Sequence, residues 1–200
     1  SPGPFWARRL RRLLPASLLT LVVIGTTGAL WLRADRLEDL GGELIATAFY
    51  LVNWRFVSAE YTYSLLFSDP SPVQHFWSLA IEAQLYLIFP VVVWAGLRIG
   101  GRLALAAIVC VGIAGSTAIG VWLGADPMLQ DRVYFGTDTR AAELLMGAAV
   151  AIAWPALQRV PRRAWDVFGG LALILLFLAF SQLSLDTRLL YRGGFLGVAV

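Results

Sequence analysis

Four polar residues between positions 75 and 86 have the types and the spacing of an acid–base site. His75, Ser78, Glu82 and Tyr86 are three, four and four residues apart. Each residue of an α-helix turns by about 100°, so residues with this spacing share one face. Imidazole titrates near neutrality and can share a proton with a carboxyl group, so a general-base pair of His75 and Glu82 is one interpretation.

The same four residues also fit a structural role. Trp77 and Gln84 point to the opposite side of such a helix. A polar seam that hydrogen-bonds to neighbouring helices, with Trp77 and Tyr86 as aromatic residues at a membrane interface, would have the same pattern. The residues alone leave both interpretations open.

A second motif is the arginine cluster RRLRRLLP, which directly precedes an apolar run. It contains Arg8, Arg9, Arg11 and Arg12, and Pro15 follows in the first turn of that run. By itself the cluster favours an anchor that holds anionic lipids on the cytoplasmic side of a membrane. Guanidinium groups also bind phosphates bidentately, so the alternative is a cytoplasmic clamp for phosphates.

A third motif, TDTR, opens another apolar run. Thr137, Asp138 and Thr139 are all suitable N-cap residues for the helix that follows, but capping explains only one of them. Arg140 and Glu143 are one helical turn apart and can form an ion pair. The surplus of polar residues indicates a role beyond capping.

No residues in the sequence form a recognisable metal site. The chain has one histidine and one cysteine, His75 and Cys110, which are far apart. It also lacks a phosphate-binding loop and a dinucleotide-binding fingerprint. We therefore expect no metal and no permanently bound cofactor.

Long apolar blocks dominate the chain and must position these motifs. Of the 200 residues, 58% are hydrophobic and only 14% are charged, which is typical of an integral membrane protein. Five blocks are long enough to span a membrane: 13–32, 79–97, 103–123, 141–157 and 167–185. A sixth apolar block begins near residue 189. The pattern predicts an all-α, polytopic transmembrane helix bundle.

One further block, residues 44–67, is unlike the others because polar residues interrupt it. Asn53, Arg55 and Glu60 lie in its middle, so we expect a broken or re-entrant segment. This arrangement keeps the three main arginine clusters, at 8–12, 98–102 and 159–163, on the cytoplasmic side, as the positive-inside rule favours. His75 and the loop 124–139 then lie near the outer face.

Taken together, the motifs resemble the acyltransferase 3 family, the integral-membrane O-acyltransferases of bacterial surface glycans and some natural products. The family's arginine motif matches Arg8, Arg9, Arg12 and Pro15. Its H-x-W-S-L-x-x-E-x-Q-x-Y motif matches His75, Trp77, Ser78, Leu79, Glu82, Gln84 and Tyr86. Its T-D-T-R-x-x-x-L-L-x-G motif matches Thr137, Asp138, Thr139, Arg140, Leu144, Leu145 and Gly147, and Asn53 and Trp54 also fit the family's pattern.

The resemblance implies a membrane O-acyltransferase in the bacterial cytoplasmic (inner) membrane. Its donor would be acyl-CoA, with acetyl-CoA expected, and its acceptor a hydroxyl of a carbohydrate or lipid-linked glycan. Membrane lipids are the other expected partners, and nucleic acid is not one.

The resemblance also assigns roles to individual residues. Arg8, Arg9 and Arg12 would hold the CoA phosphates, and His75 with Glu82 would activate the acceptor hydroxyl. The residues expected to bind substrate are Asn53, Trp77, Ser78, Tyr86, Asp138 and Arg140.

One feature of the family is missing from this sequence. Family members carry a further histidine on a membrane helix upstream of the arginine motif, and that histidine could be the base instead of His75. We therefore expect residues 1–200 to be one membrane acyltransferase domain that is truncated at both ends and inactive alone. The alternatives are a transporter or flippase-like protein for a glycan or lipid-linked substrate, and a structural membrane subunit.

Overall fold

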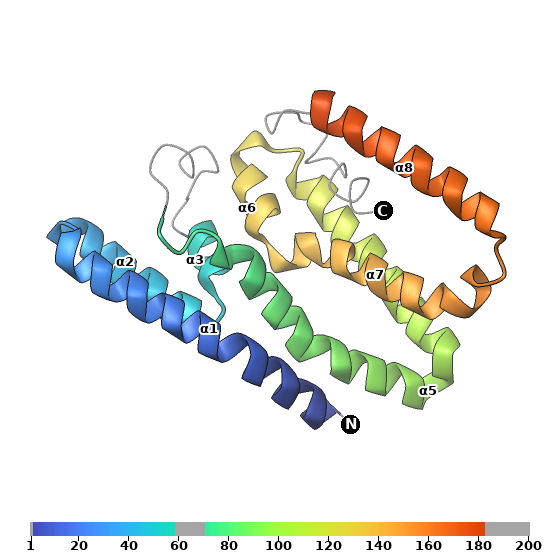
Figure 1. Cartoon of the computed structure of the whole chain (residues 1–200), viewed down its shortest axis with the longest axis horizontal. Coiled ribbons are helices and arrows are strands. Elements are labelled where there is room, and N and C mark those ends of the chain that lie inside the picture. The colour runs from blue at the N-terminus through green and yellow to red at the C-terminus, as the bar shows by residue number, and fades with distance from the viewer. Residues whose placement is uncertain (1, 59–70, 183–200) are drawn as a thin grey trace. The chain divides into compact units, whose positions relative to one another are not determined.

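All the secondary structure described for this protein is helical (Figure 1). The computed structural model describes residues 2–58 and 71–182. Its elements are α1 (Pro2–Trp31), α2 (Ala34–Ala48), α3 (Val52–Ser58), α5 (Phe76–Leu123), the 3-10 helix η1 (Pro127–Leu129), α6 (Gln130–Phe135), α7 (Thr137–Leu157) and α8 (Arg162–Gln182). The prediction of an all-α fold is confirmed.

Three of these helices are long and apolar enough to cross a membrane. They are Gly3–Trp31, Phe76–Leu123 and Thr137–Leu157. Four of the five predicted blocks fall on them, because α5 carries two blocks in succession. The fifth block coincides with α8 as far as residue 182, and α8 is not among the three; the block near residue 189 lies outside the described residues. The chain is a helical membrane protein with several spans.

The chain divides into two compact units. The first consists of Ser1–Ile99 with Tyr134–Thr137, and the second of Gly100–Val133 with Asp138–Val200. The boundary inside α5 falls on a break in that helix, where Gly100 and Gly101 have non-helical backbone angles. Gly101 has φ 64° and ψ −149°, a conformation that only glycine adopts readily.

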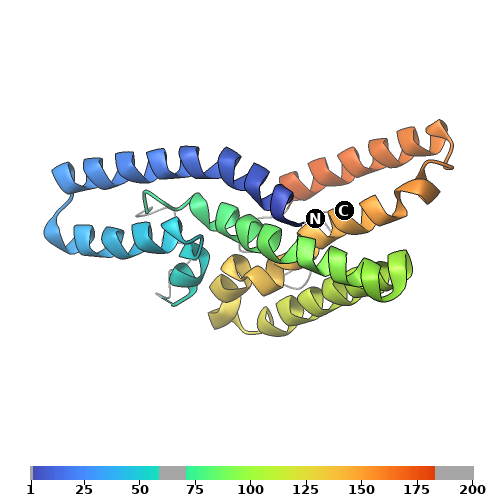
Figure 2. The same cartoon turned by 90° about the horizontal axis from the view of Figure 1, so that it is seen from below.

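In the first unit, α1 and α2 form a helical hairpin (Figure 2). They approach closely at Gly28, where a Cβ atom would lie only 2.5 Å from Cδ2 of Leu40. The N-terminal part of α1 also contacts α5, since Trp6 Nε1 donates to the Tyr86 carbonyl oxygen at 3.1 Å. α1 thus contacts α2 with its C-terminal half and the first half of α5 with its N-terminal half.

The polar block at 44–67 is interrupted over its described part, as predicted. α2 ends at Ala48 and α3 begins at Val52. Between them Tyr50 takes a left-handed conformation, with φ 55°. Glu60, the third of the polar residues that interrupt this block, lies outside the described residues.

The core of the first unit forms where α3 meets the start of α5 and the end of α6. Its buried residues are Val52, Phe56, Val73, Ala80 and Phe135. The rings of Phe56 and Phe135 pack edge to face with centroids 5.6 Å apart. This core fixes α3 next to α5, and so fixes the break that precedes α3.

In the second unit, the later half of α5 packs along α7. Ser116 Oγ donates to the Asp138 carbonyl oxygen at 2.5 Å and accepts from the Ala142 amide at 3.0 Å. Near the other end of this pair of helices, Arg102 Nη2 donates to the Ile152 carbonyl oxygen at 2.9 Å. Ser116 therefore bridges the Asp138 carbonyl and the Ala142 amide, which are four residues apart near the start of α7, and ties this turn to α5.

Candidate active site

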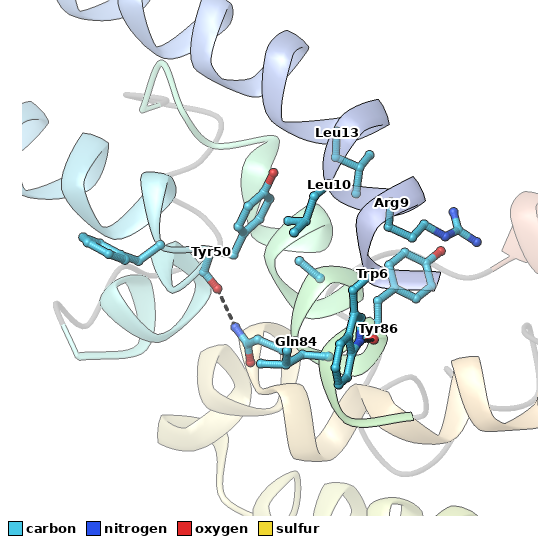
Figure 3. Close-up of a pocket in the computed structure, with 10 residues that line it drawn as sticks. Trp6, Arg9, Leu10, Leu13, Tyr50, Gln84 and Tyr86 are labelled. Atoms are coloured by element: carbon cyan, nitrogen blue, oxygen red, sulfur yellow. Dashed lines mark hydrogen bonds between the residues drawn. The ribbon is translucent and has the colours of Figure 1, made fainter. Parts of the chain in front are cut away.

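The first unit contains a cavity of about 350 Å³ between α1, the break before α3, and α5 (Figure 3). Its lining residues are Trp6, Arg9, Leu10, Leu13, Phe49, Tyr50, Ala83, Gln84, Tyr86 and Leu87. Most of them are apolar, and Arg9 is the charged one among them. An apolar pocket with a few polar groups at defined points is the usual form of a small-molecule site.

Arg9 joins the arginine motif to the H-x-W-S-L motif at one end of this pocket. Its guanidinium carbon lies 4.3 Å from the centroid of the Tyr86 ring, which is a cation–π contact. Figure 3 shows the two side chains together at the end of the pocket where Trp6 also lies. Two of the three sequence motifs thus meet in one place, although they are more than 70 residues apart.

The other two arginines of the motif lie beside Arg9 on α1. At about 100° per residue, Arg8, Arg9 and Arg12 fall within about 100° of the helix circumference. Arg8 and Arg12 are exposed, whereas Arg9 is half-buried. The cluster therefore places positive charge on the surface next to the end of the pocket.

Most residues of the predicted polar stripe are exposed. His75 directly precedes α5 and is exposed, as are Ser78 and Glu82, whereas Tyr86 is half-buried. The Tyr86 hydroxyl donates to Glu82 Oε2 at 3.4 Å. Ser78 Oγ donates to the His75 carbonyl oxygen at 3.5 Å.

His75 and Glu82 are not brought into contact. They are seven residues apart, which corresponds to about 10 Å along a helix. Within the described part of the chain the His75 ring has no hydrogen-bond partner, and the partner of the Glu82 carboxylate is Tyr86. Within the described residues, His75 and Glu82 therefore form no direct hydrogen bond with each other.

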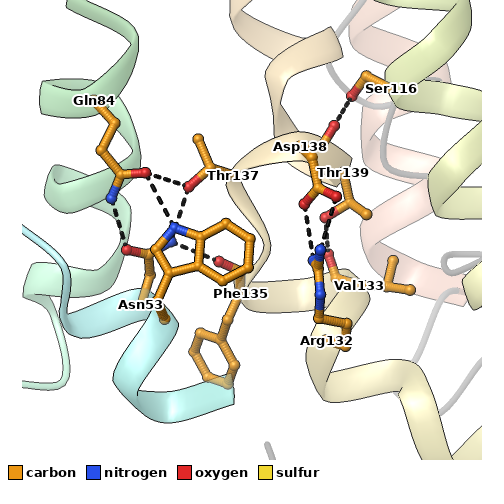
Figure 4. A network of polar contacts seen from close by, with 10 residues as sticks. Asn53, Gln84, Ser116, Arg132, Val133, Phe135, Thr137, Asp138 and Thr139 are labelled. Atoms are coloured by element: carbon orange, nitrogen blue, oxygen red, sulfur yellow. Dashed lines mark hydrogen bonds and ion pairs between the residues drawn. The ribbon is translucent and has the colours of Figure 1, made fainter. Parts of the chain in front are cut away.

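Gln84, on the opposite face of α5, is the centre of a buried amide network (Figure 4). Its Nε2 donates to the Tyr50 carbonyl oxygen at 2.7 Å and to Asn53 Oδ1 at 2.9 Å. Its Oε1 accepts from Thr137 Oγ1 at 2.6 Å and from Trp54 Nε1 at 3.2 Å. All the hydrogen-bonding groups of this side chain are in use.

Asn53 completes the network from α3. It is 0% exposed, and its Nδ2 donates to the Phe135 carbonyl oxygen at 3.0 Å and to Thr137 Oγ1 at 2.9 Å. Since its Oδ1 already accepts from Gln84, the side chain has no donor left for a ligand. This location favours a positioning role for Asn53 rather than the substrate contact expected from the sequence.

Trp77 also packs inside the first unit. Its ring centroid lies 4.7 Å from that of Tyr134 and 5.5 Å from that of Phe135. The predicted substrate-binding tryptophan thus belongs to an aromatic cluster that holds the end of α6 against α5.

The acidic residue of the TDTR motif forms an ion pair in the second unit. Asp138 is held bidentately by Arg132, with N–O distances of 2.8 and 2.7 Å (Figure 4). The sequence does not single out Arg132, because a separation of six residues across a helix break predicts no pairing.

Arg140, the basic residue of that motif, has the partner that its spacing predicted. Its Nη1 lies 2.6 Å from Glu143 Oε1, and Arg140 is only 7% exposed. Asp138 and Arg140, which the sequence predicts to bind substrate, therefore each already form an ion pair within the chain.

A buried acidic residue outside all the motifs is Glu43 on α2. Ser71 donates a hydrogen bond to its carboxylate, and both residues are buried. Burial raises the pKa of the Glu43 carboxyl above its ordinary value, while the hydrogen bond from Ser71 and the charge of Arg55 act in the opposite direction. The position of Glu43 gives no sequence signal, because nothing in the local pattern marks it as buried.

Comparison with known proteins identifies the family of the chain. A family model described as an acyltransferase domain matches residues 1–199. The peptidoglycan O-acetyltransferase OatA of Listeria monocytogenes is 38% identical over 208 residues, covering 98% of this chain and 32% of the relative. A putative peptidoglycan O-acetyltransferase of Bacillus subtilis, YrhL, is 37% identical over 207 residues, covering 98% and 32%.

A putative O-acetyltransferase of Staphylococcus aureus is 36% identical over 203 residues, covering 98% of this chain and 33% of the relative. No solved structure matches the chain significantly. The chain spans about a third of the length of these curated relatives. The family model, however, covers nearly the whole chain, and the chain belongs to the acyltransferase 3 family.

Proposed function

We propose that the protein transfers an acetyl group from acetyl-CoA to a hydroxyl group of a cell-wall glycan. The observation that carries this proposal is the meeting of Arg9 with Tyr86 at the end of an apolar pocket. The names of the relatives, which describe O-acetyltransferases of peptidoglycan, support the choice of acyl group and acceptor.

The arginine cluster and the pocket suit the two ends of an acyl-CoA molecule. Arg8, Arg9 and Arg12 would bind the phosphates, because guanidinium groups make charge-assisted, bidentate contacts with phosphate oxygens. The apolar pocket beside Arg9 would take the pantetheine arm and the thioester.

Acyl transfer then requires a base for the acceptor hydroxyl. In the proposed reaction His75 takes the hydroxyl proton as the oxygen attacks the thioester carbonyl, and the carbon–sulfur bond breaks in the tetrahedral intermediate. The proton passes from the imidazolium to the departing CoA thiolate. Glu82, which accepts a hydrogen bond from the Tyr86 hydroxyl and lies between Ser78 and Tyr86 on α5, would orient the reacting groups.

Of the remaining predicted residues, Ser78 would bind the acceptor in the first unit. Ser78 is exposed on the same face as His75, so its hydroxyl can hydrogen-bond a sugar. Asp138 and Arg140 lie in the first turn of α7, each already in an ion pair. These two residues belong to the second unit, and their contact with the substrate stays a prediction.

The test uses the full-length protein in detergent with radiolabelled acetyl-CoA and a glycan fraction. We expect label to move to the glycan, and we expect His75→Ala and Glu82→Gln to reduce this transfer at least about a hundredfold, a typical contribution of general-base catalysis. Unchanged transfer in both variants would remove the polar stripe from the reaction. Failure to bind or consume acetyl-CoA would contradict the proposal and favour a transporter.

A further inference from the structure

Tyr50 forms the end of the pocket that lies away from Arg9. Both residues line the pocket, and Figure 3 shows Leu10 between Arg9 and the Tyr50 ring. The Tyr50 hydroxyl reaches α1 and is hydrogen-bonded to Ser17 Oγ at 3.1 Å. The pocket thus has a cationic group at one end and a phenol ring at the other.

The separation of the two ends follows from the geometry of α1. Arg9 and Ser17 are eight residues apart on one continuous helix, which gives a rise of about 12 Å. Three bonds of an extended backbone advance about 3.5 Å, so this distance corresponds to a chain of roughly ten bonds. The phosphopantetheine arm of CoA has about thirteen bonds between phosphorus and sulfur, so an arm that is anchored at Arg9 and bent along the pocket brings the thioester to the Tyr50 end.

Three features hold the Tyr50 side chain in place. Its backbone is left-handed, with φ 55°, which is uncommon for a bulky residue and marks a position that its surroundings fix. Its carbonyl oxygen accepts from Gln84 Nε2 at 2.7 Å. Its hydroxyl bonds to Ser17, which is only 8% exposed. These contacts hold the Tyr50 ring in one orientation, in which it closes this end of the pocket.

We propose that Tyr50 is a specificity-determining residue that ends the acyl-donor pocket and restricts the transferred acyl group to a short chain. This inference rests on the proposed function, because it takes acyl-CoA to be the ligand of the pocket. A longer acyl group would overlap the ring, and a hydrophobic pocket discriminates by roughly tenfold or more for each methylene group that does not fit.

The experiment compares acetyl-, butyryl- and hexanoyl-CoA as donors for the full-length protein. The main variant is Tyr50→Gly, because glycine removes the ring and adopts φ 55° without strain. The matched control is Tyr50→Phe, which keeps the size of the ring and removes only the hydroxyl. Tyr50→Asn is a second small variant that also tolerates a left-handed backbone, in case Tyr50→Gly does not fold.

We expect kcat/KM of the wild-type protein to fall at least about tenfold from acetyl- to hexanoyl-CoA. Tyr50→Gly or Tyr50→Asn should raise the ratio of hexanoyl to acetyl transfer at least about tenfold, whereas Tyr50→Phe should leave it within about threefold. An unchanged ratio in a folded small variant would overturn the inference and leave the proposed function intact. If the wild-type protein consumes no acyl-CoA, the proposed function fails first and this inference falls with it.

Discussion

Arg9 and Arg11 carry the same charge two residues apart, but Arg11 does not line the pocket. If Arg9 binds a phosphate of the donor, Arg9→Gln removes a charged hydrogen bond that contributes about 1.5–3 kcal/mol. We expect this variant to raise the KM for acetyl-CoA at least about tenfold with little change in kcat. Steady-state kinetics of the full-length protein would measure both constants.

Arg11→Gln is the control, because Arg11 is exposed and its substitution removes the same charge from the same cluster. Its KM should stay within about twofold of the wild-type value. Equal effects of the two substitutions would mean that the cluster acts through its total charge, as a lipid anchor does, and would contradict a specific role for Arg9.

Gln84 can be tested as the centre of the buried amide network. Gln84→Glu keeps the shape of the side chain but removes the two N–H groups that donate to Tyr50 and Asn53. Each buried acceptor left without a donor costs about 1–3 kcal/mol, so we expect thermal unfolding at least about 3 °C lower. Gln158→Glu, the same change at an exposed position, should shift unfolding by less than about 1 °C.

An unchanged midpoint in Gln84→Glu would show that the network does not stabilise the fold.

The network also marks the limit of prediction at this scale. Helical periodicity predicted one shared face for His75, Ser78 and Glu82, and all three are exposed, but it could not tell which face of α5 packs. That depends on Asn53 and Thr137, which are distant in sequence and supply the partners of Gln84.

At the level of elements, α5 depends on a glycine at its break. Gly101 has φ 64°, so Gly101→Ala places a Cβ on a backbone that side chains rarely allow. The strain should cost about 1–3 kcal/mol and lower the unfolding midpoint by several degrees. In Gly169→Ala, at an open position inside α8, alanine should be neutral or slightly stabilising. A similar midpoint for both variants would mean that the break is not maintained.

Glu43 ties α2 to Ser71, near the start of α5, and predicts a pH dependence. Its pKa is raised in the folded protein, so the unfolded chain releases this proton at lower pH than the folded one. The stability that it contributes is therefore lost as the pH rises through the folded pKa. Glu43→Gln should unfold at a higher temperature than the wild type at pH 8, and this gap should narrow as the pH falls to about 4.

Glu38→Gln, on the exposed side of the same helix, is the control for the loss of one negative charge from α2. At pH 8 the rise in unfolding temperature should be larger for Glu43→Gln than for this control. A Glu43→Gln variant that is less stable than the wild type at pH 8 would mean that the Ser71 and Arg55 interactions outweigh burial, contrary to the direction of the pKa shift.

The elements themselves were largely predictable, because long apolar blocks have few alternatives to helices in a membrane. The polar residues of the block 44–67 also predicted its interruption correctly. The position of the break was not predictable. Tyrosine has no preference for φ 55°, and the conformation depends on tertiary contacts of Tyr50 with Gln84 and Ser17.

At the scale of the whole molecule, the resemblance of the motifs predicted a family that comparison then established. The two compact units were not predictable from the sequence, because the residues that join the first unit, Tyr134–Thr137, lie far along the chain. The prediction that residues 1–200 form one acyltransferase domain stays a prediction, and so does the topology across the membrane.

The topology can be tested with introduced cysteines and a thiol reagent that does not cross membranes. Cys110 is the only cysteine among residues 1–200, so Cys110→Ser removes the native thiol from this part of the protein. Gly3 and Ala125 are both exposed, and Gly3 has open space around it. The positive-inside rule places the end of α1 next to Arg8 in the cytoplasm, and the broken block then places Ala125 outside.

We therefore expect Ala125→Cys to be labelled in intact cells and Gly3→Cys to be labelled only after the membrane is permeabilised. Labelling of both positions from one side would contradict the broken-block topology. The result bears directly on the proposed reaction, since acetyl-CoA is expected in the cytoplasm. Arg9 can bind its phosphates only if the N-terminal end of α1 faces that compartment, and the pocket then leads from Arg9 into the membrane toward Tyr50.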